Sequence, residues 1–438
     1  MTVAFHTLGC KVNQYDSQAM LELLQKEGYT SVSFQEEADV YVINTCTVTG
    51  TGDKKSLQLA RRIRRDHPSS LLVLCGCLAQ KQGQRLLQDT GADLILGTQA
   101  RGRIAELLSR ILQDRKPICA VTPLLPGMPY ESLDISRFEG HTRASVKIQE
   151  GCGNRCTYCI IPSVRGPVRS RPLPDLQREA IRLSQCGFSE IVLTGIHLAS
   201  YGKDLTGSEI SLLDAIRAVH NVEGIRRIRL GSLEPIIATE AFCTALKSLP
   251  KVCPQFHLAL QSGSDSVLAR MRRRYNTMQY LDAVNRIRAC FPQAALTTDI
   301  LTGFPGETEE EYLQTRNFIS LVGFSRIHVF PYSPRPDTPA ARMPGQIPSA
   351  VKEQRTRELI ELGSLVSMKY LETWLGQDAK FLAEEIIDGC WEGYTSEYIR
   401  VTLPRNYSCL PGEILTVRMM EISPKGMLAE PVDPSASS

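Results

Sequence analysis

Three cysteines within eight residues form the most chemically specific pattern in the chain. Cys152, Cys156 and Cys159 are spaced Cys-x3-Cys-x2-Cys, and residues 149–162 contain no further Cys or His. A structural zinc site uses four protein ligands, and a four-iron cluster usually takes four thiolates. Three thiolates would leave one iron open, where a small molecule can bind and react. Two other interpretations stay open here: three structural cysteines, or a zinc site with a distant fourth ligand.

Composition limits the class of protein. The 438 residues are 42% hydrophobic and 22% charged, as in a globular protein of about three domains. The formal net charge is +3, so any nucleic-acid surface must be local. The sequence shows no signal peptide and no apolar stretch near the roughly 20 residues of a membrane helix. We therefore expect a cytoplasmic protein without a membrane partner, whose 14 cysteines bind metal or are buried rather than forming disulfides.

The first 115 residues alternate between patterns of strands and patterns of helices. Short apolar runs that predict strands occupy residues 3–10, 38–46, 71–77 and 92–97, and helical patterns occupy residues 17–26, 54–65 and 104–112. This alternation predicts a Rossmann-like parallel sheet covered on both faces. We expect residues 1–115 to form one domain, followed by a linker at residues 116–140, which are rich in proline and glycine.

Three of these predicted strands end in a cysteine. Cys10, Cys46 and Cys77 each stand where a strand gives way to a loop, and ligands of open parallel sheets bind at the carboxyl ends of the strands. Three adjacent strands would therefore bring three thiols to one rim. Cys75 competes with Cys77 as the third ligand, but Cys77 follows Gly76 at the end of the strand and is favoured. The alternative is three unrelated, partly buried cysteines.

Residues 141–368 repeat a strand and a helix six times. The predicted strands lie at residues 144–148, 190–194, 225–230, 255–260, 296–301 and 326–330. Six units predict a partial (β/α)6 barrel, since a complete barrel needs eight. Chemistry in such barrels sits at the carboxyl ends of the strands. Polar or glycine-containing segments stand there, including Gly195, Ser232, Glu234 and Gln261.

Arginines cluster directly after the three-cysteine loop. Arg165, Arg169 and Arg171 lie in a segment with proline and glycine, so we expect them to overhang the active site. Guanidinium groups at such a place suit a phosphate backbone. Two other arginine runs, at residues 61–65 and 270–274, are better explained as solvated helix faces.

The tail changes from helical to strand periodicity. Short strand patterns separated by turns fill about 60 residues, and they predict a small all-β barrel at residues 371–434. Barrels of this kind hold RNA with aromatic and basic side chains. The candidates are Tyr394, Tyr398, Arg400 and Arg405, although ordinary strand tyrosines would look the same.

Several segments resemble one known family. The loop from Cys152 to Cys159 resembles the signature of radical S-adenosylmethionine (SAM) enzymes. Residues 7–16 (Thr-Leu-Gly-Cys-Lys-Val-Asn-Gln-Tyr-Asp) and 43–48 (Ile-Asn-Thr-Cys-Thr-Val) look like the N-terminal domain of the methylthiotransferases. The tail resembles the RNA-binding TRAM domain. The resemblance covers nearly the whole chain.

This resemblance implies two [4Fe-4S] clusters. One would be held by Cys152, Cys156 and Cys159 and would cleave SAM to a 5′-deoxyadenosyl radical. The other, an auxiliary cluster that carries the transferred sulfur, would be held by Cys10, Cys46 and Cys77. The resemblance also suggests that Gly195, Ser232, Glu234 and Gln261 contact SAM.

Within the family, the opening motif is more similar to the branch that acts on threonylcarbamoyladenosine at position 37 of tRNA. The implied reaction is methylthiolation of adenine carbon 2, with the tRNA anticodon stem-loop and an electron donor such as flavodoxin or ferredoxin as partners. Three alternatives stay open. The substrate could be isopentenyladenosine in tRNA or an aspartate of a ribosomal protein, or the chain could be a non-catalytic, metal-stabilised RNA-binding protein.

Overall fold

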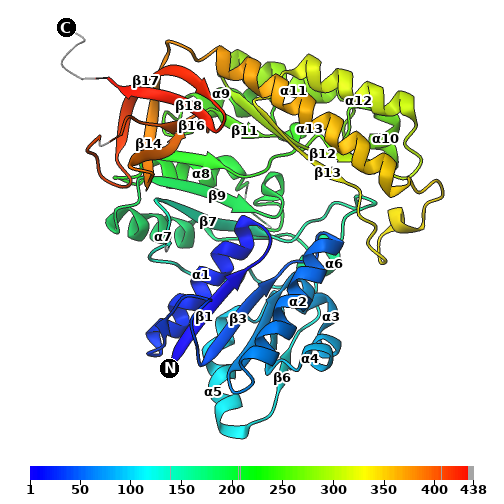
Figure 1. The fold of residues 1–438 in the computed structure, drawn as a ribbon, viewed down its shortest axis with the longest axis vertical. Helices are drawn as coiled ribbons and strands as arrows, with labels where there is room; N and C mark the ends of the chain where they lie inside the picture. The colour runs from blue at the N-terminus through cyan, green and yellow to red at the C-terminus, as the bar shows by residue number, and fades with distance from the viewer. Residues whose placement is uncertain (139, 206, 208, 406, 433–438) are drawn as a thin grey trace.

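The chain folds into three regions that follow one another in the sequence (Figure 1). The computed structural model describes residues 1–138, 140–205, 207, 209–405 and 407–432. Two regions contain parallel sheets covered by helices, which confirms the predicted α/β class, and the third is a β-barrel. In the described part of the chain, no helix is long and apolar enough to cross a membrane.

The N-terminal region is a six-stranded parallel sheet with the order β2-β1-β3-β4-β5-β6. Its strands are β1 (Thr2–Thr7), β2 (Thr30–Ser31), β3 (Val40–Thr45), β4 (Leu71–Gly76), β5 (Leu94–Leu96) and β6 (Ile118–Ala120). Every residue of β3 is buried, because helices cover both faces of the sheet. Helices α1 (Lys11–Lys26) and α5 (Ile104–Asp114) pack on one face. The other face is covered by α2 (Gly50–Asp66), α3 (Cys77–Gln82) and α4 (Gln84–Thr90).

The segment predicted as a linker is not a simple connection. Its β6 pairs with β5 and completes the N-terminal sheet. Further along, Leu133, Ile135 and Phe138 are buried in the core of the central region. The prediction of a linker over residues 116–140 is therefore wrong in these parts, since the proline-rich composition masks short apolar contacts with both neighbours.

The central region contains six parallel strands in the order β7-β9-β10-β11-β12-β13. Isolated bridges, Ile228–Val252 and Leu233–Leu258, connect the two sheets that make up this order. A short strand, β8 (Arg169–Ser170), pairs antiparallel with β7. The six parallel strands are β7 (Arg143–Glu150), β9 (Glu190–Gly195), β10 (Arg227–Leu230), β11 (Gln255–His257), β12 (Ala295–Thr302) and β13 (Arg326–Pro331).

Helices cover the outer face of these strands. They are α7 (Leu173–Gln185), α8 (Leu212–His220), α9 (Glu240–Lys247), α11 (Thr277–Cys290), α12 (Glu309–Val322) and α13 (Ser349–Glu372), with the short α6 (Ile161–Arg165) and α10 (Asp265–Arg270) at the ends of strands. Capping boxes start α8, α11 and α12 and satisfy backbone donors there. In β10 the apolar Ile228 and Leu230 belong to the core beneath the helices. The alternate residues, Arg227 and Arg229, contact the C-terminal barrel instead.

The C-terminal region is a closed barrel with the order β14-β15-β16-β18-β17. Its strands are β14 (Asp378–Ile387), β15 (Cys390–Thr395), β16 (Arg400–Thr402), β17 (Ile414–Ser423) and β18 (Gly426–Pro431). A turn separates β15 from β16, and Tyr398 in that turn has a positive φ of 67°. Residues 433 and 434 of the predicted domain lie outside the described residues.

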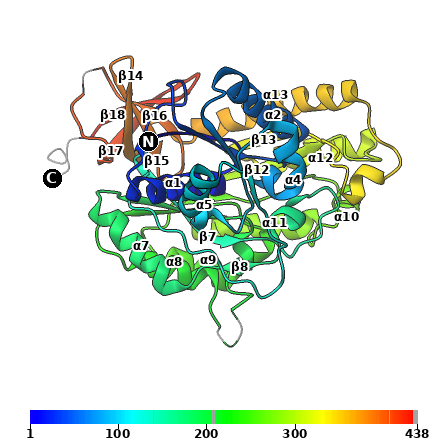
Figure 2. The ribbon, with the colours of Figure 1, turned by 90° about the horizontal axis from the view of Figure 1, so that it is seen from below.

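Charged side chains fill the interface between the N-terminal and central regions, where α1 lies along β7 (Figures 1 and 2). Lys147 of β7 contacts Asp16 of α1 at 2.5 Å and Glu150 at 3.0 Å. Arg101 contacts both Asp16 and Glu150, the latter at 2.9 Å. Arg165 of α6 also contacts both carboxylates, at 3.2 Å for Asp16. We call these five side chains the interface network; each is at most 2% exposed.

The network fixes how the two regions dock. Burial raises the pKa of Glu150, but the surrounding cations outweigh it and hold this pKa well below its usual range. The pKa of Asp16 is also lowered, because the same cations outweigh its burial. Both acids are therefore ionised, and a buried ion whose partner is removed is strongly destabilising.

We expect Arg101→Met to lower the free energy of unfolding by about 3–5 kcal/mol, measured by urea denaturation. The matched control is Arg103→Met, in the same short helical segment, whose side chain is exposed beside Glu106. This control should leave the stability nearly unchanged. Equal effects of the two substitutions would contradict a structural role for the network.

Candidate metal centres at one rim

Three cysteines of the N-terminal region stand at the carboxyl ends of neighbouring strands. Cys10 follows β1 and precedes α1, Cys46 follows β3, and Cys77 begins α3 directly after β4. Because β1, β3 and β4 are adjacent and parallel, their ends meet at one edge. The thiol of Cys77 lies close enough to those of Cys10 and Cys46 for both to raise its pKa, after burial as the main cause. The structure therefore brings these three predicted residues together.

Cys75 and Cys77 have different surroundings. Cys75 lies inside β4, is 0% exposed and belongs to the apolar core under α1 and α5. Cys77 packs against Ile160 and Val164 of the central region. This placement agrees with the choice of Cys77 as the third ligand.

The second triplet lies in the loop after β7. The Asn154 backbone donates a hydrogen bond to the Cys152 sulfur at 3.4 Å, and Arg273 donates to the Cys156 sulfur at 3.3 Å. Gly151 starts this loop with φ 74°, and a Cβ there would lie 1.8 Å from the Pro167 carbonyl oxygen. Only glycine permits this close turn.

The N-terminal triplet lies next to the segment that follows the second triplet. Cys77 contacts Ile160, which follows Cys159 directly. The guanidinium of Arg165 donates through Nε to the Cys77 sulfur at 3.2 Å. The same side chain belongs to the interface network. Arg165 therefore joins the interface network to the N-terminal triplet.

Each cysteine triplet supplies three free thiols that could hold a four-iron cluster. Among the described residues, no three His, Cys, Asp or Glu side chains are arranged to hold one ion. A four-iron cluster binds one thiolate at each iron, so its thiols need not converge on a point. Burial raises the pKa of Cys77 to about 11 and that of Cys159 to about 12, so bound metal must displace their protons. Arg165 donates to the Cys77 sulfur and Arg273 to the Cys156 sulfur, and such guanidinium groups stabilise thiolates.

Comparison with known proteins agrees with this geometry. The family model described as Uncharacterized protein family UPF0004 matches residues 2–97, and that of the Radical SAM superfamily matches residues 146–319. The chain is 41% identical to the threonylcarbamoyladenosine tRNA methylthiotransferase MtaB of Bacillus subtilis, over 96% of this chain and 94% of that protein. It is 36% identical to the MtaB protein of Thermotoga maritima, over 98% and 96% respectively. The chain belongs to the radical SAM methylthiotransferase family.

This methylthiotransferase has SAM and two four-iron clusters as its cofactors. It is also 36% identical to the tRNA-2-methylthio-N(6)-dimethylallyladenosine synthase of Pelotomaculum thermopropionicum, over 86% of this chain and 85% of that one. Among solved structures, a radical SAM methyltransferase from Kitasatospora setae, TsrM, matches with a TM-score of 0.58 at 15% identity. That match covers 78% of this chain and 77% of the other and shows a shared fold.

The residues predicted to contact SAM all stand at ends of the central strands. Gly195 ends β9, Ser232 and Glu234 follow β10, and Gln261 bridges to β12 beyond the end of β11. Ser232 is exposed and Gln261 is half-buried. Gln261 has a positive φ of 72°, an unusual backbone state that clusters at functional sites.

Glu234 is linked to the second triplet through residues that the sequence analysis missed. Asn154 donates to its carboxylate at 2.8 Å, Arg273 contacts it at 3.1 Å, and His197 lies at 3.0 Å. Burial raises the pKa of Glu234, but these partners lower it to about 2. Arg273 therefore contacts both the ionised carboxylate of Glu234 and the sulfur of Cys156. Its only sequence signal was the run at residues 270–274, which was interpreted as a solvated helix face.

The structure contradicts the prediction that the arginines after the loop contact RNA. Arg165, Arg169 and Arg171 are at most 1% exposed. Arg171 pairs with Glu179 and Asp134, and Arg169 donates to backbone carbonyls. The reason is that α6 and β8 fold this segment back against the N-terminal region, a contact between distant segments that composition does not reveal. Exposed arginines at this rim are instead Arg155, Arg272 and Arg274.

Two of the tyrosines predicted to bind RNA are engaged within the protein. The rings of Tyr394 and Tyr398 stack with centroids 4.6 Å apart. The guanidinium of Arg143 lies over both rings, and that of Arg229 lies over Tyr398. These contacts use the ring faces that base stacking would need, so the structure disagrees with this prediction. Arg400 pairs with Glu392 and remains half-exposed, and Arg405 is exposed.

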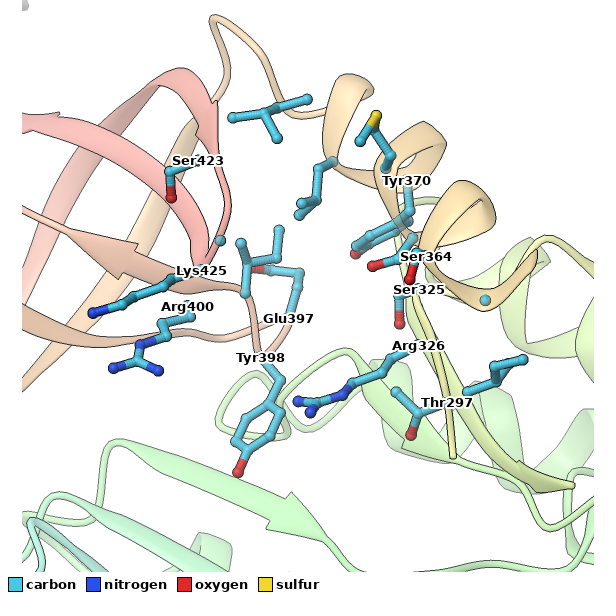
Figure 3. Close-up of a pocket in the computed structure, with 18 of the residues that line it drawn as sticks. Thr297, Ser325, Arg326, Ser364, Tyr370, Glu397, Tyr398, Arg400, Ser423 and Lys425 are labelled. Carbon is cyan, nitrogen blue, oxygen red and sulfur yellow. The ribbon is translucent and has the colours of Figure 1, made fainter. Parts of the chain in front are cut away.

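The larger cavity does not lie beside the cysteines. It measures about 510 Å³ and lies between α13, the barrel and the first residues of β12 and β13 (Figure 3). Arg326, Arg400 and Lys425 line it together with Tyr398, whose ring points from the barrel towards the central sheet. The residues that line it include none of the six cysteines and none of their sequence neighbours, so this cavity is separate from the metal centres.

The different surroundings of Cys75 and Cys77 predict different effects of their replacement. Cys77→Ala should lose the auxiliary cluster because its thiol faces the rim, whereas Cys75→Ala should keep it. Iron per chain after anaerobic reconstitution, with circular dichroism to verify folding, provides the measurement. Loss of iron in folded Cys75→Ala but not in Cys77→Ala would show that the ligand is misassigned.

Proposed function

We propose that this enzyme methylthiolates carbon 2 of N6-threonylcarbamoyladenosine at position 37 of tRNA. The observation that carries the proposal is the placement of two cysteine triplets at one rim, in a chain similar over nearly its full length to two MtaB proteins. Carbon 2 of adenine bears an unactivated hydrogen that no side-chain base can remove. Cofactors must therefore supply the chemistry, and the chain must bring them together.

Each triplet has its own proposed task. Cys152, Cys156 and Cys159 would hold the cluster that binds SAM, and Cys10, Cys46 and Cys77 would hold the auxiliary cluster. Bound there, the two clusters would supply the 5′-deoxyadenosyl radical and the sulfur. The chain's own part is positional: Arg273 and Arg165 hold one thiolate of each triplet. Gly195, Ser232, Glu234 and Gln261 remain our candidates for the SAM side.

The substrate would bind with its adenine extruded into the rim. Exposed Arg155, Arg272 and Arg274 suit the phosphates of an anticodon stem-loop, and Arg400 lies on the barrel, which we propose is a TRAM domain. The proposed domains are residues 1–115, 141–368 and 371–434. An electron donor such as flavodoxin or ferredoxin, and a cytoplasmic location, would follow from this activity.

The alternatives have weaker support. The dimethylallyladenosine synthase is also a relative, at 36% identity, so isopentenyladenosine in tRNA is the second candidate. Similarity to named methylthiotransferases and the two thiol triplets argue against a non-catalytic RNA-binding protein.

Mass spectrometry of tRNA nucleosides tests the proposal. Cells without this protein should lack 2-methylthio-N6-threonylcarbamoyladenosine and accumulate its precursor, while the methylthio derivative of isopentenyladenosine stays unchanged. Loss of the latter nucleoside alone would assign the enzyme to the other branch.

The two triplets should be separable by substitution. Folded Cys46→Ala should still cleave SAM to 5′-deoxyadenosine with a strong reductant, because the loop from Cys152 to Cys159 is intact, but it should form no methylthiolated tRNA. Cys156→Ala should do neither. Methylthiolation by Cys46→Ala at the wild-type rate would refute the role given to the first triplet.

A further inference from the structure

A second cavity, of about 350 Å³, lies where the three regions of the chain meet. Lys11 and Gln14 of α1 form one wall, and Tyr398 of the barrel forms another. Ser145 and Val192, which pair across β7 and β9, also line it. The cavity therefore opens onto the face of the central strands opposite α7 and α8, and its volume falls within the range of small-molecule sites.

Lys11 differs from the other cations near this cavity because it has no acidic partner among the described residues. Arg143 pairs with Glu384 at 2.5 Å, and Arg229 pairs with Glu190 at 2.9 Å. Among the residues that the structure describes, no carboxylate lies within ion-pair distance of the Lys11 ammonium group. Glu385, the remaining acid of the wall, is exposed to solvent.

The electrostatic surroundings of Tyr398 show that this part of the cavity favours negative charge. Burial alone raises the pKa of a phenol. The pKa of Tyr398 is nevertheless lowered, because Arg143 and Lys11 outweigh its burial. An anion in the cavity would experience the same positive potential.

One wall of the cavity is joined through the sequence to the proposed auxiliary metal centre. Lys11 directly follows Cys10, a residue of the N-terminal triplet. In adenine, carbon 2 and the N6 nitrogen flank N1 on the same edge of the base. A substituent on N6 therefore extends from the edge at which carbon 2 reacts, and it needs a space beside the N-terminal triplet.

We propose that Lys11 binds the free carboxylate of the threonylcarbamoyl group in this cavity and so selects that substrate. The proposal rests on the proposed function and names the residue that recognises the substituent. A charge-assisted hydrogen bond to an ammonium without another partner is strong. An uncharged dimethylallyl group would leave the ammonium unpaired, and sites built for a polar group reject analogues that lack it.

The affinity of the protein for synthetic anticodon stem-loops tests the proposed role of Lys11 without requiring the enzyme to react. The probes are one synthetic RNA carrying the free threonylcarbamoyl acid and the same RNA with that acid as its methyl ester. The wild type should prefer the acid by about tenfold or more. Lys11→Met should abolish the preference by weakening binding of the acid alone, and Lys11→Arg should restore it. Lys26→Met, at the far end of α1 and exposed, should behave as the wild type.

These binding measurements test the role of Lys11 independently of the proposed activity. They also distinguish the threonylcarbamoyl carboxylate from the carboxylate of SAM. SAM also carries a carboxylate, so the affinity for SAM should be unchanged in Lys11→Met; a loss confined to SAM would overturn the proposal. Equal binding of acid and ester by the wild type would overturn it too, even if Lys11→Met folds poorly. In that case tRNA from cells lacking the protein could still show the proposed activity, so the two failures are distinguishable.

Discussion

The interface network is the constraint on which the rest of the site depends. Asp16 and Glu150 come from different regions of the chain and share three cations in a space that excludes water. Each carboxylate would be costly to bury alone, and each cation would be equally costly. Glu131 also pairs with Arg101 at 2.8 Å, so three carboxylates face three cations in this docked arrangement. In that arrangement, the end of the N-terminal sheet faces the ends of the central strands.

One side chain of the interface network, Arg165, also contacts a proposed metal ligand. Arg165 contacts Asp16 and Glu150 and also donates to the Cys77 sulfur. Arg273 has a similar position on the other side, between Glu234 and Cys156. In both cases an ionised carboxylate orients a guanidinium, which in turn stabilises a thiolate. The same electrostatic arrangement therefore supports the fold and positions the ligands.

The elements that local sequence determines were predicted well. Cys10, Cys46 and Cys77 could be placed at strand ends because apolar runs and the residues that end them are local signals. The Cys152 loop was found because its spacing is itself local. Arg165 and Tyr398 could not be placed in this way. Their surroundings are made by segments far away in the sequence, so an arginine expected on the surface became part of the core, and a tyrosine expected to bind RNA packed beneath guanidinium groups. The cavity at Lys11 likewise exists only where three regions meet.

The central claim is that one chain holds two clusters, one at each triplet. Iron and acid-labile sulfide, measured per chain after anaerobic reconstitution of the whole protein, test it most directly. Two four-iron clusters predict about eight of each. A fully loaded, folded protein with only about four of each, or with zinc and no sulfide, would contradict the account.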